Sequence, residues 1–223
     1  FAEPHRTGVL ENFIENLETA WGDPGTARFP FDTFNFHHYL QPGSIPAAYE
    51  AMRPASGHMP VWVTESYFHF RQGVKTSDLD LSEDQRKLRA RFVTTNLVTA
   101  LQEDPRQFFT FVLPHYVESG VLFGLLNADG TPRADYLALA AAGRLLAGAR
   151  TTGIIREEFP IHTFSAMPDG ERKNVVVTWS ENERPFPEKL RGFEKAYDFI
   201  GREVKPEVIG KEPLYLIFGK SAW

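Results

Sequence analysis

Strand-like and helix-like segments alternate three times in the first 150 residues, and this alternation constrains the fold of the chain more than any other feature. The strand-like segments are rich in β-branched and aromatic residues, whereas the helix-like segments repeat apolar residues three and four positions apart. The expected strands are residues 31–40, 60–67 and 108–113, and the helices that follow them are about 46–53, 83–103 and from Thr131 onward. This order is typical of a parallel sheet built from strand–helix units.

Several helix boundaries are marked by capping or breaking residues. Ser82 and Gln85 have the spacing of a capping box, in which each side chain satisfies a backbone N–H of the other residue. Thr7 is expected to cap an earlier helix that ends before the breaker at residues 22–25. Pro132 is expected in the first turn of the last helix, where a proline is tolerated. The residues expected along the buried side of the long helix are Leu88, Phe92, Leu97 and Leu101.

The pattern changes near residue 150. The remaining apolar segments are short, rich in β-forming residues and separated by turns such as the one at residues 168–170. They are residues 152–159, 161–166, 174–179, 195–199 and 213–218. We expect a small antiparallel β-sandwich over residues 150–223, after an α/β portion over residues 1–149.

The composition excludes several classes of function. The chain has no cysteine, so disulfides, thiol nucleophiles and thiolate metal sites are ruled out. A net charge of −5 without a basic run argues against nucleic-acid binding. No segment approaches the roughly 18 uninterrupted apolar residues of a membrane-spanning helix. No phosphate-binding glycine loop or nucleophile elbow is present. We expect a soluble protein without a cofactor, and both a cytoplasmic and a secreted location fit.

Glu65 is the most unusual of the charged residues. It follows the apolar run at residues 60–63, and buried strands seldom place an unpaired charge at their end. The carboxyl ends of parallel strands are also where α/β enzymes carry out their chemistry. From spacing alone, a capping or salt-bridged surface carboxylate explains Glu65 equally well.

Alternation along residues 31–40 separates an apolar face from a polar face. The apolar face holds Phe34, Phe36, His38 and Leu40, and the polar face holds Thr33, Asn35, His37 and Tyr39. On the next strand, Glu65 has the same parity as Val61 and Val63. We expect Glu65, His37 and Tyr39 to converge if both polar faces point into a barrel. Taken alone, His37 also suits a structural histidine and Tyr39 a core tyrosine.

Three segments, in this order, resemble clan A glycoside hydrolases. Residues 32–39 (DTFNFHHY) resemble the sixth barrel strand of these enzymes, and residues 60–65 (PVWVTE) resemble the seventh strand. Residues 123–126 and 129–136 resemble the segment after their eighth strand. The resemblance implies a partial (β/α)8 TIM barrel, containing strands five or six to eight with their helices. The region that ends at residues 212–216 is similar to the C-terminal β-sandwich of many of these enzymes.

The resemblance also implies residue roles. Glu65 matches the nucleophile of a retaining glycosidase, and Tyr39 would donate a hydrogen bond to it. The remaining site residues would contact an oligo- or polysaccharide substrate: Asn35, His37, Tyr67, His69, His115 and Tyr116. His37 would bind sugar hydroxyls or tune the acid/base, and the loop aromatics suit plain packing equally well. Trp62 has the parity of Thr64 and is interpreted as a packing residue.

The chain departs from that family in two places. The acid/base residue of the family stands in an Asn-Glu-Pro tripeptide, which is absent here. Ala2-Glu3-Pro4 is the nearest match, but only one helix separates it from the His-x-Tyr strand. The expected eighth strand and the loop after it, residues 111–116, lack the usual tryptophan. We interpret the start at Phe1 as an internal cut. Because a half barrel leaves open strand edges, an N-terminal half is expected as partner, on the same gene product or on a companion chain.

Two alternative functions stay open from the sequence. A non-catalytic carbohydrate-binding or scaffold barrel would keep the shape without the chemistry. A metal-dependent barrel hydrolase would use His37, His38, His69 or His115 with Glu65. Since His37 and His38 are adjacent on a strand, they point to opposite faces and cannot both bind one ion there.

Overall fold

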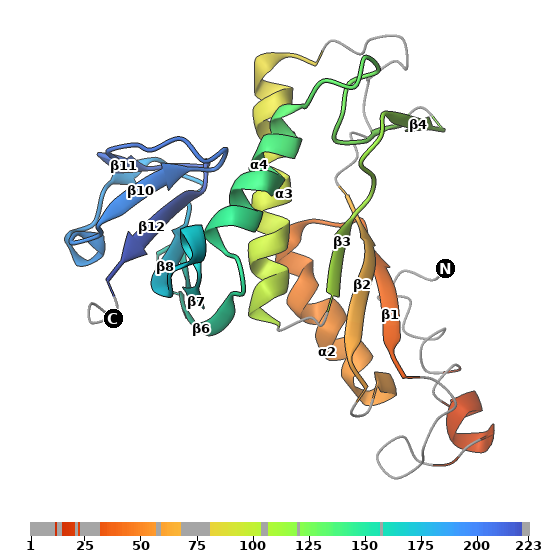
Figure 1. Cartoon of the computed structure of the whole chain (residues 1–223). Helices are drawn as coiled ribbons and strands as arrows, with labels where there is room; N and C mark the ends of the chain where they lie inside the picture. Colours follow the sequence, from red (N-terminus) through yellow and green to blue (C-terminus); the bar gives the residue numbers. More distant parts are fainter. Residues whose placement is uncertain are drawn as a thin grey trace.

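The computed structural model describes residues 12, 15–20, 22, 32–56, 59–67, 81–103, 107–119, 121–156 and 158–219. Over these residues the chain forms a parallel sheet, a central pair of helices and an antiparallel β region (Figure 1). Of the helix expected after Thr7, residues 12 and 15–20 are described and are helical. No helix within the described ranges combines the length and hydrophobicity that crossing a membrane requires.

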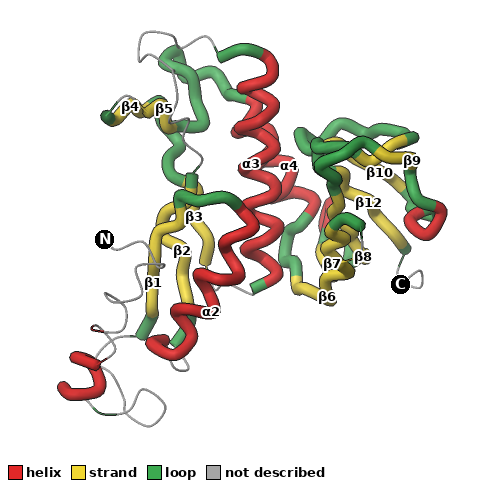
Figure 2. Tube along the Cα trace, turned by 180° about the vertical axis from the view of Figure 1, so that it is seen from behind, coloured by secondary structure: helices red, strands yellow, loops and turns green. Residues whose placement is uncertain are grey.

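The parallel sheet confirms the expected strand–helix alternation. Its strands are β1 (Phe34–His38), β2 (Val61–Ser66) and β3 (Gln107–Thr110), in that spatial order. A 3-10 turn, η1 (Pro42–Ser44), and helix α2 (Ile45–Ser56) connect β1 to β2, and helix α3 (Glu83–Gln102) precedes β3. Both helices cover the same face of the sheet (Figure 2). The core beneath them includes Phe36, Ile45, Tyr49, Met52, Val63 and Ala100.

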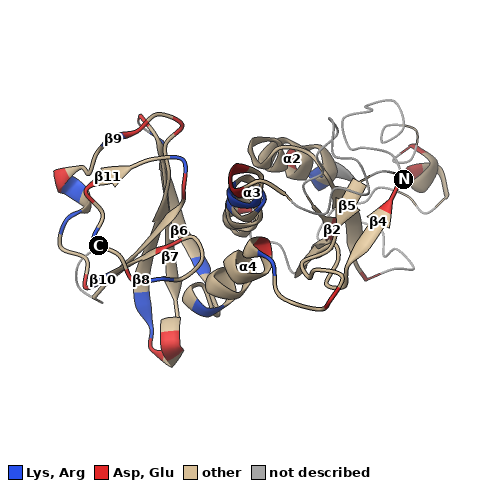
Figure 3. Cartoon of the chain, turned by 90° about the horizontal axis from the view of Figure 1, so that it is seen from above, with Lys and Arg blue, Asp and Glu red and all other residues tan. Residues whose placement is uncertain are grey.

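Helix α3 begins with the expected capping box. The backbone N–H of Gln85 donates to Ser82 Oγ (3.2 Å), and the Ser82 N–H donates to Gln85 Oε1 (2.9 Å). The expected apolar stripe is only partly correct, because Phe92 is buried whereas Leu88, Leu97 and Leu101 are half-buried. Buried residues instead occur around much of the helix. Helices α3 and α4 lie between the two sheets (Figure 3), so α3 has no single solvent-facing side.

Helix α4 begins later than the sequence predicts. After β3 the chain forms the antiparallel pair β4 (Tyr116–Glu118) and β5 (Val121–Phe123), and α4 spans Ala134–Leu145. Pro132 lies before the helix and not in its first turn, so that prediction is wrong. The cause is local strand pairing: Pro132 bridges Leu126, and the Arg133 N–H donates to the Leu125 carbonyl at 3.0 Å. These contacts hold the backbone extended as far as Arg133.

The region after residue 150 is antiparallel, as expected. Five strands pair in the order β10-β12-β8-β7-β6, and two short strands, β9 and β11, pair with each other. The strand bounds are β6 Arg150–Arg156, β7 Pro160–Ala166, β8 Lys173–Thr178, β9 Arg184–Pro185, β10 Lys195–Asp198, β11 Val208–Ile209 and β12 Leu214–Phe218. Two 3-10 turns connect consecutive strands: η2 (Pro168–Gly170) lies between β7 and β8, and η3 (Glu188–Leu190) lies between β9 and β10.

Both faces of the five-stranded sheet are covered. On one face, Phe164, Val177 and Tyr215 pack against Val98 of α3 and Leu145 of α4. The other face packs against the layer that contains β9 and β11. The core between them includes Ile161, Leu190, Ile209, Leu216 and Phe218. Apolar packing is therefore continuous across residue 150, where the secondary structure changes from α/β to β.

His162 on β7 is a buried titratable group in this sheet. Its side chain is 3% exposed, and its ring stacks on Trp179 with centroids 4.8 Å apart and an interplanar angle of 14°. Burial, assisted by the positive charge of Arg156, lowers the pKa of His162 from its usual value near 6.5 to about 4. The imidazole is therefore neutral at pH 7.

We expect the stability of the chain to fall with acidification between pH 6.5 and pH 4 because of His162. The unfolded state binds a proton on this histidine near pH 6.5, whereas the folded state binds it only near pH 4, so acid favours unfolding across that interval. The full contribution is roughly 3 kcal/mol. Urea denaturation across this pH range measures it, and His162→Gln should remove this part of the slope. Equal slopes in the wild type and the variant would contradict the assignment.

Candidate active site

A register shift in β2 decides which way Glu65 points. Phe36 of β1 pairs with Val63, but the next residue, His37, pairs with Glu65, so Thr64 is one residue in excess on β2. Pairing with β3 shifts over the same stretch, between Val63 and Ser66. A shift of this kind reverses the alternation of faces beyond it. Glu65 therefore does not share the face of Val63.

The sequence prediction of a common face for Val61, Val63 and Glu65 is accordingly wrong. Val63 is buried against α2, and Val61 packs on the same core. Glu65 emerges on the face of the sheet opposite α2 and α3, where it contacts His37. The convergence predicted for Glu65, His37 and Tyr39 is nevertheless observed, because the extra residue turns Glu65 toward the polar side of β1.

The Glu65 carboxylate is held by two side chains at one oxygen. The Tyr39 hydroxyl donates to Glu65 Oε2, and His37 Nδ1 lies 3.2 Å from the same oxygen. The side chains of His37 and Glu65 are 28% and 32% exposed, so the carboxylate remains accessible. This arrangement fixes the orientation of a charged group at the carboxyl end of a parallel strand.

Tyr39 is suited to act as a permanent hydrogen-bond donor. Burial raises the pKa of its hydroxyl, and the hydrogen bond to Glu65 raises it further. Its ring meets Phe111 and Phe123 edge-on, with centroid distances of 6.5 and 6.4 Å. These contacts restrain the ring, and the hydroxyl stays protonated over the neutral range.

The other predicted site residues are placed differently from one another. Asn35 lies on the face opposite α2 and α3, where its Oδ1 accepts a hydrogen bond from Thr64 Oγ1 at 3.4 Å. Tyr116 is 38% exposed, and its ring packs edge-on against Phe111 at 5.8 Å. It thus belongs to the same aromatic group as Tyr39. His69 falls outside the described residues.

Trp62, interpreted from the sequence as a packing residue, contacts Phe109 with ring centroids 6.3 Å apart. Phe109 itself is exposed. The neighbouring residue, Phe108, packs against the core beneath α2 and α3, so Phe109 is directed to the opposite side of β3. This face of the sheet therefore carries aromatic as well as polar side chains.

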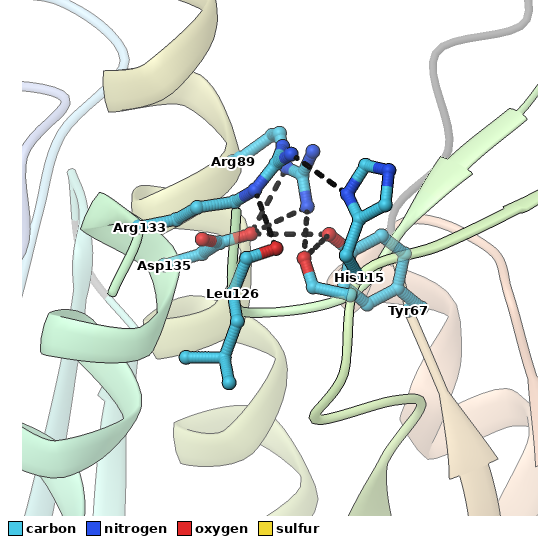
Figure 4. A network of polar contacts seen from close by, with 7 residues as sticks. Tyr67, Arg89, His115, Leu126, Arg133 and Asp135 are labelled. Atoms are coloured by element: carbon cyan, nitrogen blue, oxygen red, sulfur yellow. Dashed lines mark hydrogen bonds and ion pairs between the residues drawn. The ribbon is translucent and has the colours of Figure 1, made fainter. Parts of the chain in front are cut away.

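Tyr67 is directed into the interior of the protein. Its side chain is 2% exposed, and its hydroxyl lies 3.0 Å from Asp135 Oδ2 and 3.2 Å from the Gly124 carbonyl oxygen (Figure 4). The Arg89 guanidinium donates to the same two oxygens. Its Nε donates to Asp135 Oδ2 at 3.0 Å, and its Nη2 donates to the Gly124 carbonyl at 2.9 Å. Tyr67 therefore anchors the end of β2, and its hydroxyl is engaged in this network.

The Arg89–Asp135 ion pair lies at the centre of this network. Both side chains are 2% exposed, and Arg89 Nη2 is 2.6 Å from Asp135 Oδ2. Burial raises the pKa of the Asp135 carboxyl, and the positive charges of Arg89 and Arg133 oppose that effect. Arg133 extends the network, with Nε donating to the Leu126 carbonyl at 3.0 Å and Nη2 lying 3.4 Å from His115 Nδ1 (Figure 4).

Gly124 makes this close approach feasible. Its φ is +90°, and a Cβ atom there would lie 2.2 Å from the Pro114 carbonyl oxygen. A side chain at this position would therefore displace the backbone that Arg89 and Tyr67 contact.

Sequence reasoning missed Arg89 and Asp135. Asp135 is the second residue of α4, a position where a carboxylate is ordinarily explained by the helix dipole. Arg89 stands in a helix that carries many charged residues. Only the pairing of α3 with α4 identifies them as partners.

The two adjacent histidines of β1 point to opposite faces, as expected. His37 contacts Glu65, whereas His38 is buried with Nε2 3.0 Å from Ser44 Oγ. Across the part of the chain that the structure describes, no three or more His, Asp or Glu side chains gather into a metal-binding group.

No protein-family model and no curated protein sequence matches this chain. One similar solved structure is a family 39 glycoside hydrolase from the gut symbiont Bacteroides cellulosilyticus WH2, with 16% identity and a TM-score of 0.55 over 97% of this chain and 56% of that one. Another is a thermostable mutant of a xylanase (Xyn10A) from Cellvibrio japonicus, with 16% identity and a TM-score of 0.40 over 59% of this chain and 43% of that one. The chain thus spans about half the length of the family 39 enzyme, and its fold is similar to that part of it.

Proposed function

We propose that this chain is part of a retaining glycoside hydrolase in which Glu65 is the nucleophile. The observation that carries the proposal is the accessible Glu65 carboxylate at the end of β2, contacted at Oε2 by Tyr39 and His37. The similarity in fold to a family 39 glycoside hydrolase supports the same class. The substrate is an oligo- or polysaccharide.

In this reaction Glu65 attacks the anomeric carbon of the sugar. A carboxylate oxygen forms a bond to that carbon while the bond to the leaving-group oxygen breaks, and a second carboxyl group protonates the leaving group. Water then attacks the same carbon, gives its proton to that second carboxylate and releases Glu65. Tyr39 donates to Glu65 throughout, because its own raised pKa keeps the hydroxyl protonated. Asn35 and His37 would bind sugar hydroxyls, and the exposed ring of Tyr116 would contact a sugar face.

We place the second carboxylate on an N-terminal half of the barrel. A barrel of this class has eight strands, whereas β1, β2 and β3 form a sheet of three in the described residues. In a retaining enzyme the two carboxyl groups lie about 5–5.5 Å apart, across the sugar. The partial barrel of residues 1–149 would supply the nucleophile, and its partner segment would supply the acid/base.

Covalent labelling tests the nucleophile assignment directly. A 2-deoxy-2-fluoro glycosyl fluoride reacts with the nucleophile but not with the general acid, since fluoride leaves without protonation. In the protein that carries this chain together with the N-terminal half, peptide mapping should locate the label on Glu65. Glu118→Gln is the matched control, because the charge of Glu118 also acts on Tyr39, and this variant should still be labelled. A label on any other residue refutes the assignment, and saccharide binding without labelling favours a non-catalytic carbohydrate-binding barrel.

Tyr39→Phe should lower kcat roughly 10- to 100-fold while the protein stays folded. The change removes one hydrogen bond to a charged group, an interaction whose free energy corresponds to this range of rates. Steady-state kinetics with an aryl glycoside measure the loss. Tyr136→Phe is the control, since this residue lies outside the proposed site and the change likewise keeps the ring and loses only a hydroxyl, so its kcat should stay near the wild-type value. Equal losses in the two variants would contradict a specific role for the Tyr39 hydroxyl.

A further inference from the structure

A cavity of about 570 Å³ lies where α3 meets the strands β6 and β7. Residues of η1, including Pro42 and Gly43, close one side, and Trp179 and Glu181 beyond β8 close another. Helix α3 stands between the β1–β2–β3 sheet and this part of the antiparallel sheet (Figures 2 and 3). The volume is within the range of about 300–1,000 Å³ typical of small-molecule sites. The residues so far assigned to catalysis do not line it.

His162 is a polar residue that lines this cavity and whose ring nitrogens have no hydrogen-bond partner in the described structure. Its side chain is 3% exposed. Buried polar atoms without partners are rare, because each has lost its hydrogen bonds to water. A bound group that forms a hydrogen bond with such an atom recovers this free energy. The low pKa of His162 keeps its ring neutral, with one nitrogen as donor and the other as acceptor. Two hydroxyl groups, one accepting from the N–H and one donating to the other nitrogen, complement such a ring.

The rest of the lining also suits a saccharide. Trp179 stacks on His162, and the apolar side chains of Leu88 and Phe92 on α3 also line the cavity. Sugars present C–H groups that pack on such surfaces. Arg91, Arg156 and Glu181 add charged groups of both signs. Guanidinium and carboxylate groups form paired hydrogen bonds, which match neighbouring hydroxyls on a sugar ring.

We propose that this cavity is a second saccharide-binding site, separate from Glu65, that takes one or two neutral sugar units. It rests on the proposed function in one respect, since both sites would engage the same polysaccharide. The geometry of the cavity is independent of the chemistry at Glu65. Binding there would hold a polymer on the far side of α3 while another part of it is hydrolysed.

The test follows the ring nitrogens of His162 and the indole N–H of Trp179 by NMR in the protein that carries this chain together with the N-terminal half. Short xylo-, cello- and manno-oligosaccharides are the probes, and inorganic phosphate is the comparison. At least one saccharide should shift both signals saturably, and phosphate should not. Arg91→Gln and Glu181→Gln should each weaken binding about tenfold or more, because each removes hydrogen bonds to a charged group. Their controls, Arg86→Gln on the same helix and Glu183→Gln two residues along, should bind as the wild type does.

Three results would overturn the second site: no saccharide shifts the His162 signals, only phosphate does, or the Arg91 and Glu181 variants bind as tightly as their controls. Glu65→Gln separates this proposal from the proposed function, since it should leave the His162 response unchanged. If saccharides shift His162 but no reagent labels Glu65, the second site stands and the nucleophile assignment fails. If Glu65 is labelled and His162 does not respond, the reverse holds.

Discussion

Replacing Glu65 by glutamine is expected to lower kcat for glycoside hydrolysis by about 10⁴-fold or more, because the proposed covalent intermediate forms on this carboxylate. The amide has nearly the same shape as the carboxylate, and the side chain is one-third exposed. The fold should therefore be retained. Steady-state kinetics measure the loss, and thermal unfolding and circular dichroism check the fold. Hydrolysis near the wild-type rate would remove Glu65 from the mechanism.

Chemical rescue distinguishes a nucleophile from a general acid. In Glu65→Ala the space beside Tyr39 and His37 is open to a small anion such as azide. Azide there attacks the anomeric carbon from the face that Glu65 would use, so the glycosyl azide formed from an activated substrate should have the inverted configuration. NMR of the product gives the configuration. A product of retained configuration would assign Glu65 as the acid/base.

Asp135→Ala is expected to lower the free energy of unfolding by about 3–5 kcal/mol. The change leaves the Arg89 guanidinium buried without its counter-charge, and uncompensated buried charges are strongly destabilising. The Tyr67 hydroxyl loses one of its two acceptors at the same time. Urea denaturation at neutral pH measures the difference.

Two further variants show whether the Arg89–Asp135 pair causes this loss. Combining Arg89→Leu with Asp135→Leu removes both charges, so it should cost much less than Asp135→Ala alone. Tyr67→Phe removes only a neutral hydroxyl and should cost about 1 kcal/mol. If the double variant is as unstable as Asp135→Ala, packing and not the unpaired charge explains the loss.

The order of elements was predictable because each element has a local signal. The period of apolar residues distinguished the strands around Val63 and Phe108 from the helix around Phe92, and the Ser82–Gln85 box marked a helix start correctly. The meeting of Glu65 with His37 and Tyr39 also followed from neighbouring polar strand positions. The face of Glu65 was not predictable. It depends on a register shift at Thr64, which is a property of three paired strands and not of β2 alone.

The buried network depends on contacts that are distant in sequence. Arg89 and Asp135 are 46 residues apart, and Tyr67 and Asp135 are 68 residues apart. Each residue has an ordinary local explanation, so no single segment indicates the pairing. Pro132 shows the same limit on a smaller scale, since its bridge to Leu126 overrides its preference for a first helical turn.

The position of α3 between two sheets has a consequence for how the chain can be divided. Val98 packs toward the antiparallel sheet, whereas Ala100, two residues later, packs beneath β1 and β2. Cutting the chain near residue 150 would leave Val98, Ala142 and Leu145 facing water. The β region and the helices α3 and α4 therefore share one core, and we expect a cut near residue 150 to destabilise both parts.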